Sequence, residues 1–136
     1  MIFGVMINLS MNLIGEFKGK NTGYRVLSDG SMEVSGQGRG KLLGIDAFIV
    51  FTTVGSNSGG IFMGEGNGVI TTMDGKTVVL RMNSIGYPSE NGGISRGASI
   101  QATDDEEFIR LNKTICLHEY MTDMNDEWTG KIWEWK

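Results

Sequence analysis

The fold of this chain is decided at Gly60-Gly-Ile-Phe-Met-Gly-Glu-Gly-Asn-Gly-Val-Ile-Thr-Thr-Met-Asp-Gly75, which continues as Lys76-Thr-Val-Val-Leu-Arg-Met-Asn83. The stretch predicts a strand, a tight Asp-Gly turn and a second strand. Because side chains alternate across a strand, Gly64, Gly66 and Gly68 share one face, and Glu65 and Asn67 share the other. The hairpin therefore carries a bare glycine strip on one side.

The rest of the chain repeats this pattern of strands separated by turn residues. Strands are predicted over 16–27, 32–43, 45–54, 61–72, 76–86, 94–103, 111–122 and 128–135. One short helix is predicted near 104–110, where acidic residues occupy the first turn and Asp104 or Asp105 can cap it. Regular strands of about ten residues in meander order indicate an all-β protein, an eight-stranded antiparallel up-and-down barrel. Such a barrel has room for packed side chains or for one small ligand.

The chain of 136 residues divides into an apolar N-terminal segment, 1–15, and a single barrel domain, 16–136. The segment has no charged side chain. It is shorter than the about 20 residues of a membrane span and lacks the basic start of a signal peptide. The alternatives are a segment that covers a sheet edge or forms a subunit contact, which we favour, and a processed leader; we predict no membrane partner.

Charge and cysteine content limit the classes of function. The net charge is −4, which argues against a nucleic-acid partner. It does not exclude a local basic stripe, since Arg39 and Lys41 are close in sequence and Lys18, Lys20 and Arg25 lie upstream. A single cysteine, Cys116, excludes an intrachain disulfide, and with one histidine it argues against a structural zinc site. We predict a reducing, cytoplasmic location and no cofactor.

Glycine is in excess, with 21 residues against one proline. Gly36-Gln-Gly-Arg-Gly40 repeats the G-x-G-x-G pattern of Gly64–Gly68 within a strand. A bare strip permits close packing by a large neighbour, sharp coiling of the strand or space for a ligand. We favour packing and curvature. The pattern is not a dinucleotide-binding motif, because no helix follows it.

The periodicity leaves open which face of strand 61–72 points inward. If Glu65 and Asn67 face the interior, they form a polar spot in an apolar lumen, as in many ligand pockets. Alternatively, Phe62, the glycines and Ile70 face inward.

Strand 111–122 carries the other candidate polar residues. Alternation places Cys116, His118 and Tyr120 on one face and Glu119 on the other. Glu119 either assists proton transfer or grips a ligand inside the barrel, or it pairs with Arg81 or Arg96, which we favour. We expect His118 to be exposed. Cys116 and His118 alone do not make a cysteine enzyme, which needs a third group and an oxyanion hole.

The chain resembles a family of small, largely uncharacterised prokaryotic β-barrels that end in Trp-Glu-Trp-Lys. The resemblance covers about Gly15 to Lys136 and is carried by these stretches: Leu27 with Asp29-Gly30, Gly64–Gly68 with Met73-Asp-Gly75, Glu119-Tyr120, and Lys131-Ile-Trp-Glu-Trp-Lys136. The family in turn is remotely similar to the calycin-like barrels of the allene oxide cyclase and dirigent type. The chain departs from the family at Val79–Ser84. The resemblance implies an oligomeric barrel that holds hydrophobic molecules in its lumen.

We therefore predict a barrel that binds a small hydrophobic ligand and forms a homo-oligomer. The predicted ligand-binding residues are Glu65, Asn67, Arg81, Glu119 and Tyr120, and no catalytic or metal-binding residue is predicted. One alternative is a cofactor-free isomerase or cyclase in which a lumen carboxylate assists. Another is a filled barrel that serves as a structural or interaction protein. The tryptophans Trp128, Trp133 and Trp135 are expected to be core or interface anchors.

Overall fold

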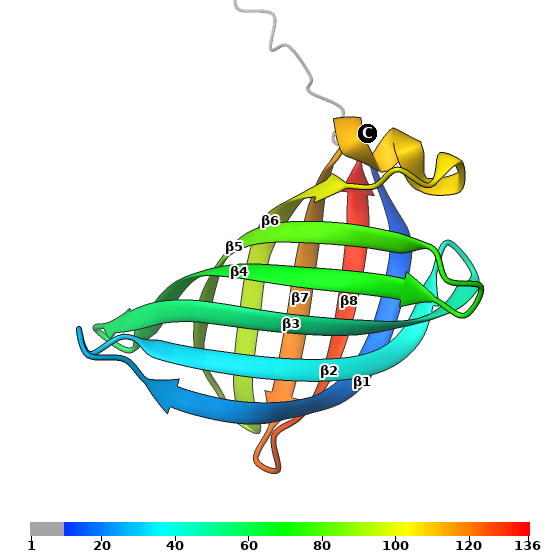
Figure 1. The fold of residues 1–136 in the computed structure, drawn as a ribbon. Helices are drawn as coiled ribbons and strands as arrows, with labels where there is room; N and C mark the ends of the chain where they lie inside the picture. The colour runs from blue at the N-terminus through cyan, green and yellow to red at the C-terminus, as the bar shows by residue number, and fades with distance from the viewer. Residues whose placement is uncertain (1–9) are drawn as a thin grey trace, which may run out of the picture.

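The computed structural model describes residues 10–136, which form a closed barrel of eight antiparallel strands in sequence order (Figure 1). The strands are β1 (Met11–Val26), β2 (Met32–Leu42), β3 (Ile45–Ser58), β4 (Ile61–Thr72), β5 (Thr77–Ser89), β6 (Gly92–Ala102), β7 (Ile115–Asp123) and β8 (Glu127–Trp135). A 3₁₀ helix, η1 (Glu106–Lys113), joins β6 to β7. β1 pairs with β8, so the sheet has no free edge. The predicted barrel is confirmed.

Glycine turns join the strands where the sequence predicts them. Gly30 and Gly75 both have positive φ, at 87° and 86°, a conformation that costs residues with a Cβ more than it costs glycine. The Asp29 carboxylate accepts a hydrogen bond from the Ser31 backbone N–H at 2.9 Å, which fixes the first hairpin.

The start of β1 and the boundary between η1 and β7 differ from the predicted positions. β1 begins at Met11 and not at residue 16, so the last part of the predicted segment 1–15 belongs to the barrel. The part of that prediction that concerns residues 1–9 lies outside the described residues. The helix is longer than predicted and runs to Lys113, so β7 begins at Ile115. Asp105 occupies the N-cap position, but its carboxylate accepts the Thr77 backbone N–H at 2.8 Å instead of capping the helix.

The helix η1 closes one end of the barrel. Its Phe108 and Leu111 side chains are 0% and 1% exposed and pack into the core. Gln101 on β6 anchors the helix by donating from Nε2 to the carbonyls of Leu111 and Thr114, at 3.1 and 2.7 Å. Figure 1 shows η1 beside the C-terminus, at one end of the barrel. This end is filled with side chains.

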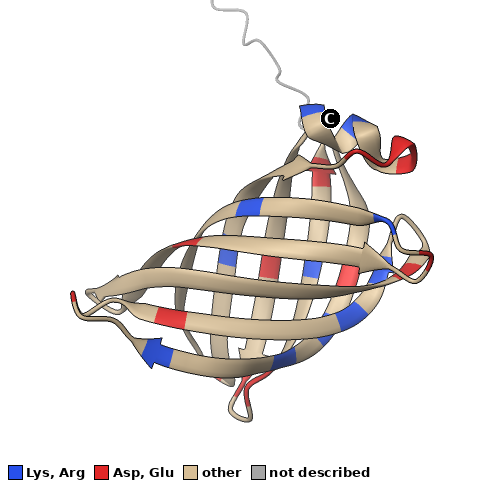
Figure 2. Ribbon diagram, in the orientation of Figure 1, with Lys and Arg blue, Asp and Glu red and all other residues tan. Residues whose placement is uncertain are grey.

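A row of alternating charges crosses the outer wall. Lys41, Glu16, Lys131, Glu119 and Arg96 follow one another as cross-strand partners on β2, β1, β8, β7 and β6. Figure 2 shows a row of alternating blue and red bands across these strands. Opposite charges at facing positions stabilise a sheet by about 0.2–1 kcal/mol per pair, and they help to fix the register.

Among residues 10–136, no helix has the length and apolar character needed to cross a bilayer.

Candidate ligand site in the barrel lumen

Burial alternates along each strand and settles which face points into the barrel. On β4, Gly66, Gly68 and Ile70 are buried, while Glu65 and Asn67 are exposed. The second of the two open alternatives is therefore correct, and the glycine strips of β2 and β4 line the interior.

Each central aromatic side chain of the lumen lies over a glycine of another strand. Phe51 on β3 is flanked by Gly36 on β2 and Gly68 on β4. A Cβ at Gly36 would come within 2.5 Å of the Phe51 ring, and a Cβ at Gly38 would come within 2.6 Å of the Trp128 ring. A Cβ at Gly130 would come within 2.4 Å of Tyr120. The predicted packing role of the glycine strips is thereby explained, since only bare positions leave room for these rings.

These rings form one cluster across β3, β7 and β8. The ring centroids of Tyr120 and Trp128 are 5.2 Å apart, those of Phe51 and Trp128 are 5.5 Å apart, and those of His118 and Tyr120 are 5.4 Å apart. Their tilted and edge-to-face arrangement is the favourable one for aromatic pairs. The cluster makes one wall of the lumen rigid and apolar.

A cavity of about 470 Å³ occupies the half of the lumen opposite η1. Its lining combines aromatic and aliphatic side chains with uncharged polar groups and one carboxylate, and comprises Asn21, Tyr24, Val34, Phe51, Thr53, Phe62, Met82, Ser84, Gly86, Gly92, Gly93, Ser95, His118, Tyr120, Thr122, Asp123, Met124 and Trp128. Ligand pockets usually have volumes of about 300–1,000 Å³ and this kind of lining. The geometry is that of a site for a small, mainly apolar molecule.

The titratable groups on the inner face of β7 are held in their neutral forms. Burial lowers the pKa of His118 to about 4, and burial raises the pKa of Tyr120 above its ordinary value. His118 is 6% exposed, so the prediction of an exposed histidine is wrong. The strand alternation itself, which places His118 with Tyr120 and Cys116, is correct.

The polar groups at the mouth are engaged in the turns. Asp123 accepts the backbone N–H groups of Asn125 and Glu127 at 2.7 and 3.0 Å. Tyr24 donates its hydroxyl hydrogen to Asp126. No lysine or arginine lines the cavity among the described residues. The lumen therefore offers hydrogen-bonding groups without a positive charge.

Beyond the cavity floor, the barrel holds a buried carboxylate, Glu134, and a buried thiol, Cys116. Burial by itself would raise the pKa of Glu134, but hydrogen bonds from Arg110 and Asn12 outweigh it and lower this pKa. Burial, with the nearby Glu134 charge, raises the pKa of Cys116 to about 12, so the thiol stays protonated. Within residues 10–136, no three His, Cys, Asp or Glu side chains are grouped so that they could hold a metal ion.

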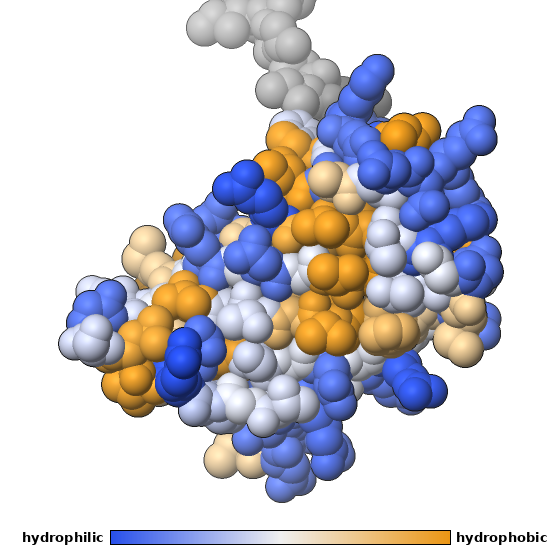
Figure 3. Space-filling view, viewed as in Figure 1, coloured by the Kyte–Doolittle hydropathy of each residue, from blue (hydrophilic) through white to orange (hydrophobic). Residues whose placement is uncertain are grey.

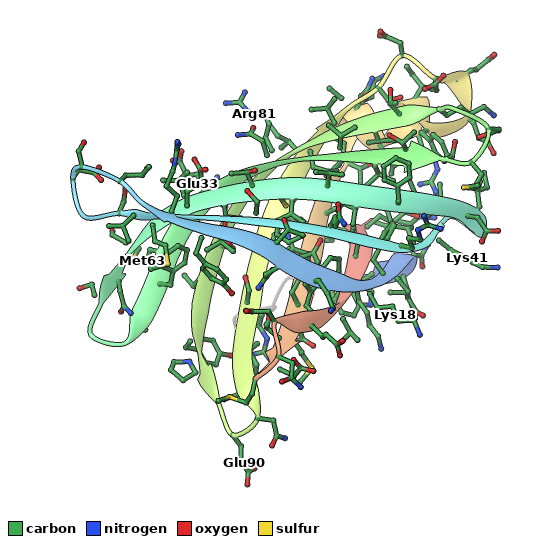
Figure 4. The ribbon with its side chains drawn as sticks, turned by 60° about the horizontal axis from the view of Figure 1, so that its bottom comes forward. Lys18, Glu33, Lys41, Met63, Arg81 and Glu90 are labelled. Carbon is green, nitrogen blue, oxygen red and sulfur yellow. The ribbon has the colours of Figure 1, made fainter. Side chains whose placement is uncertain are left out.

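Of the five predicted ligand-binding residues, the structure places Tyr120 alone in the lumen. Glu65, Asn67, Arg81 and Glu119 lie on the outer wall, and Figure 4 shows Arg81 pointing away from the barrel. Glu119 accepts a hydrogen bond from Arg96 Nε at 2.8 Å, which confirms the favoured pairing but places it on the outside. Sequence reasoning missed Phe51, Met82 and the lumen position of His118. The signal that could have found them was the pairing of aromatic residues with the glycine strips.

The fold and the cavity together define a small closed eight-stranded antiparallel β-barrel with a half-open lumen. No protein-family model matches the chain, and no curated protein matches it. It is similar in structure to a conserved protein of unknown function from Rhodopseudomonas palustris, with a TM-score of 0.80, 10% identity, and coverage of 97% of this chain and 100% of the other.

Two further solved structures share the fold. A beta-barrel like protein from Acinetobacter baumannii AYE has a TM-score of 0.77 and 12% identity, with 98% of this chain and 100% of the other covered. A protein with unknown function from Clostridium acetobutylicum ATCC 824 has a TM-score of 0.75 and 8% identity, with 93% and 99% covered. These similarities establish the small barrel fold. The resemblance to allene oxide cyclases stays a prediction.

Proposed function

We propose that this protein binds a small hydrophobic molecule in the lumen of its barrel. The observation that carries the proposal is the cavity of about 470 Å³ between the aromatic cluster and the mouth. A barrel of this size can be filled by its own side chains, and the half next to η1 is filled in that way. The other half is lined by large rings that stop short of filling it.

The alternative of an isomerase or cyclase lacks a supporting observation. It requires a carboxylate that faces the cavity, whereas Glu65 and Glu119 lie on the outer wall and the buried Glu134 lies outside the cavity lining and pairs with Arg110. Asp123 lies at the mouth, where it accepts two backbone N–H groups of a turn. The cavity therefore supports binding better than catalysis. It also argues against a completely filled barrel.

The test is to block the cavity and measure binding of a neutral aromatic probe, naphthalene, by the quenching of tryptophan fluorescence. Ser84 and Asn83 are neighbours on β5, and Ser84 lines the cavity while Asn83 faces outward. Ser84→Phe places a ring in the cavity, and Asn83→Phe places the same ring on the outer wall.

We expect the wild-type protein and Asn83→Phe to bind naphthalene with similar affinity, and Ser84→Phe to lose at least tenfold. Equal binding by all three proteins would place the probe outside the lumen and contradict the proposal. Circular dichroism and thermal unfolding check that both variants remain folded.

A further inference from the structure

The buried polar side chains of the barrel differ in how they are satisfied. Six polar or charged residues are buried among the described residues: Thr72, Ser99, Gln101, Thr103, His118 and Glu134. Five of these six form side-chain hydrogen bonds. For example, the Ser99 hydroxyl donates to Gln101 Oε1 at 2.6 Å, and the Thr103 hydroxyl donates to the Thr77 carbonyl at 2.6 Å. His118 forms none with the described residues, and burial is what lowers its pKa.

A fully buried polar atom without a hydrogen-bond partner costs a protein about 1–3 kcal/mol, and among the described residues Trp128 Nε1 is such an atom. The His118 nitrogens also have no partner among the described residues, but they are not fully enclosed, because His118 lines the cavity. On the same strand, Cys116 lies deeper and belongs to the packed core, while Tyr120 and Thr122 lie closer to the mouth. The cross-strand partners of His118 are Gly97 and Ile132, and neither has a polar side chain. His118 is therefore a polar group without a protein partner at the floor of the cavity.

The charges around the cavity restrict what can meet His118. The lining contains no lysine or arginine, and its one carboxylate, Asp123, lies at the mouth. A ligand carboxylate at the floor would lose its hydration without gaining a counter-charge, which is costly. A hydroxyl or carbonyl group loses much less hydration free energy on burial. It can also pair with a neutral imidazole, which has one donor and one acceptor nitrogen.

We propose that the lumen selects an uncharged ring-containing molecule whose hydroxyl or carbonyl group is held by the His118 imidazole at the cavity floor. This inference rests on the proposed function and specifies the chemistry of the ligand. The rings of Phe51, Tyr120 and Trp128 contact the apolar body of the ligand. His118 orients the ligand, so that its polar group enters the barrel first.

Three probes of the same ring size test this inference: naphthalene, 2-naphthol and 2-naphthoate. Calorimetry gives the affinity of each for the wild-type protein, for His118→Phe and for Thr129→Val, a control that removes an exposed hydroxyl from the outer wall. One net hydrogen bond corresponds to about two- to tenfold in affinity. We expect 2-naphthol to bind about fivefold more tightly than naphthalene, and 2-naphthoate at least tenfold more weakly than 2-naphthol.

In His118→Phe the preference for 2-naphthol over naphthalene should disappear, whereas Thr129→Val should retain it. Binding of naphthalene without a preference for 2-naphthol, a preference retained in His118→Phe, or tightest binding of 2-naphthoate would each overturn the inference and leave the lumen proposal intact. Failure of all three probes to bind would overturn both.

A second measurement does not depend on the folding of a variant. The chain has one histidine, so its imidazole ¹⁵N signals are assigned without ambiguity. 2-Naphthol should shift the two nitrogen signals unequally, because one of them forms the hydrogen bond, while naphthalene should not. Equal responses to both probes would contradict a hydrogen bond to His118.

Discussion

His118 makes the stability of the barrel depend on pH. Its pKa in the folded protein is about 4, below the ordinary value of 6.5. Between these two values the unfolded chain binds a proton at His118 and the folded protein does not, so stability falls as the pH falls through this window. The loss ends below about pH 4, where the folded protein also binds the proton.

We therefore predict that the free energy of unfolding decreases by about 3 kcal/mol between pH 7 and pH 4, at 1.36 kcal/mol per pKa unit. Urea denaturation at a series of pH values measures this. Because the chain has one histidine, His118→Phe should remove most of the slope above pH 4.5. A slope that persists unchanged in the variant would assign the pH dependence to other groups.

At the residue scale, the sequence correctly predicted which residues share a face of a strand, but it did not predict which face points into the barrel. Alternation grouped Cys116, His118 and Tyr120 on one face, as the structure confirms. It could not decide between the two faces of strand β4, because glycine has no side chain to mark a buried face. The opposite face also carries exposed apolar residues such as Met63 and Val69, which resemble core residues in a sequence. Burial here depends on the neighbouring strands, which periodicity does not record.

At the scale of elements, the pairing of glycines with rings is a packing device that can be tested. Gly38→Ala introduces a Cβ that would lie 2.6 Å from the Trp128 ring and 2.7 Å from the Lys18 carbonyl oxygen. Overpacking of this kind usually costs about 1–3 kcal/mol. We predict this loss in the free energy of unfolding, measured by urea denaturation.

Gly23→Ala is the matched control for this substitution. A Cβ at Gly23, which lies on β1, has no neighbour within 4 Å. The variant should be neutral, or stabilised by about 0.4–1 kcal/mol because the unfolded chain loses freedom. Equal losses in the two variants would indicate a general intolerance of alanine and not ring packing.

The helix η1 should act as a structural plug. Phe108→Ala removes a fully buried ring at the closed end, and we predict a loss of about 3–5 kcal/mol in the free energy of unfolding. Ile109 follows it in the same helix but is 47% exposed, so Ile109→Ala should cost less than about 0.5 kcal/mol. Thermal and urea unfolding compare the two. Similar effects would show that η1 packs loosely against the barrel.

The elements themselves were predictable where local chemistry fixes them. Asp-Gly and Gly-Gly pairs located the hairpins, and alternation located the strands. The extent of η1 and the start of β7 were not predictable from local chemistry. Leu111 is held by its contacts with the core and with Gln101, which is ten residues away in sequence. Contacts of this kind depend on barrel closure.

At the scale of the whole molecule, the outer wall has an uncovered apolar strip. Phe48, Val50, Val69 and Val79 on β3, β4 and β5 are 40–46% exposed, and Figure 3 shows hydrophobic residues gathered over these strands. On one side Arg39 pairs with Phe48 across the strands, and Lys18 pairs with Arg39. On the other side lie the acidic residues that begin η1.

We propose that a second copy of this chain covers the strip in a two-fold symmetric dimer. In such a dimer the same patch meets itself, so the basic border of each copy faces the acidic border of the other. Lys18 and Arg39 form no ion pair within the described residues, and neither do Asp104 and Glu106, so these charges remain available.

We predict that sedimentation equilibrium finds a dimer for the wild-type protein. The double variant Lys18→Glu with Arg39→Glu, and the double variant Asp104→Lys with Glu106→Lys, should each be monomeric, because like charges then face each other. An equimolar mixture should regain the dimer, since both contacts become complementary. A monomeric wild-type protein, or two variants that assemble normally, would contradict this dimer.

The closure of one end of the barrel by η1 also affects how long a ligand stays bound. Because η1 fills its end of the barrel, in the described part of the chain a ligand arrives and departs through the opening next to Asp123 and Met124. A group that enters first leaves last, so the residence time depends on passage past this rim as well as on the strength of the contacts at the floor. Changes at the rim would then speed or slow exchange in both directions while leaving the equilibrium affinity almost unchanged.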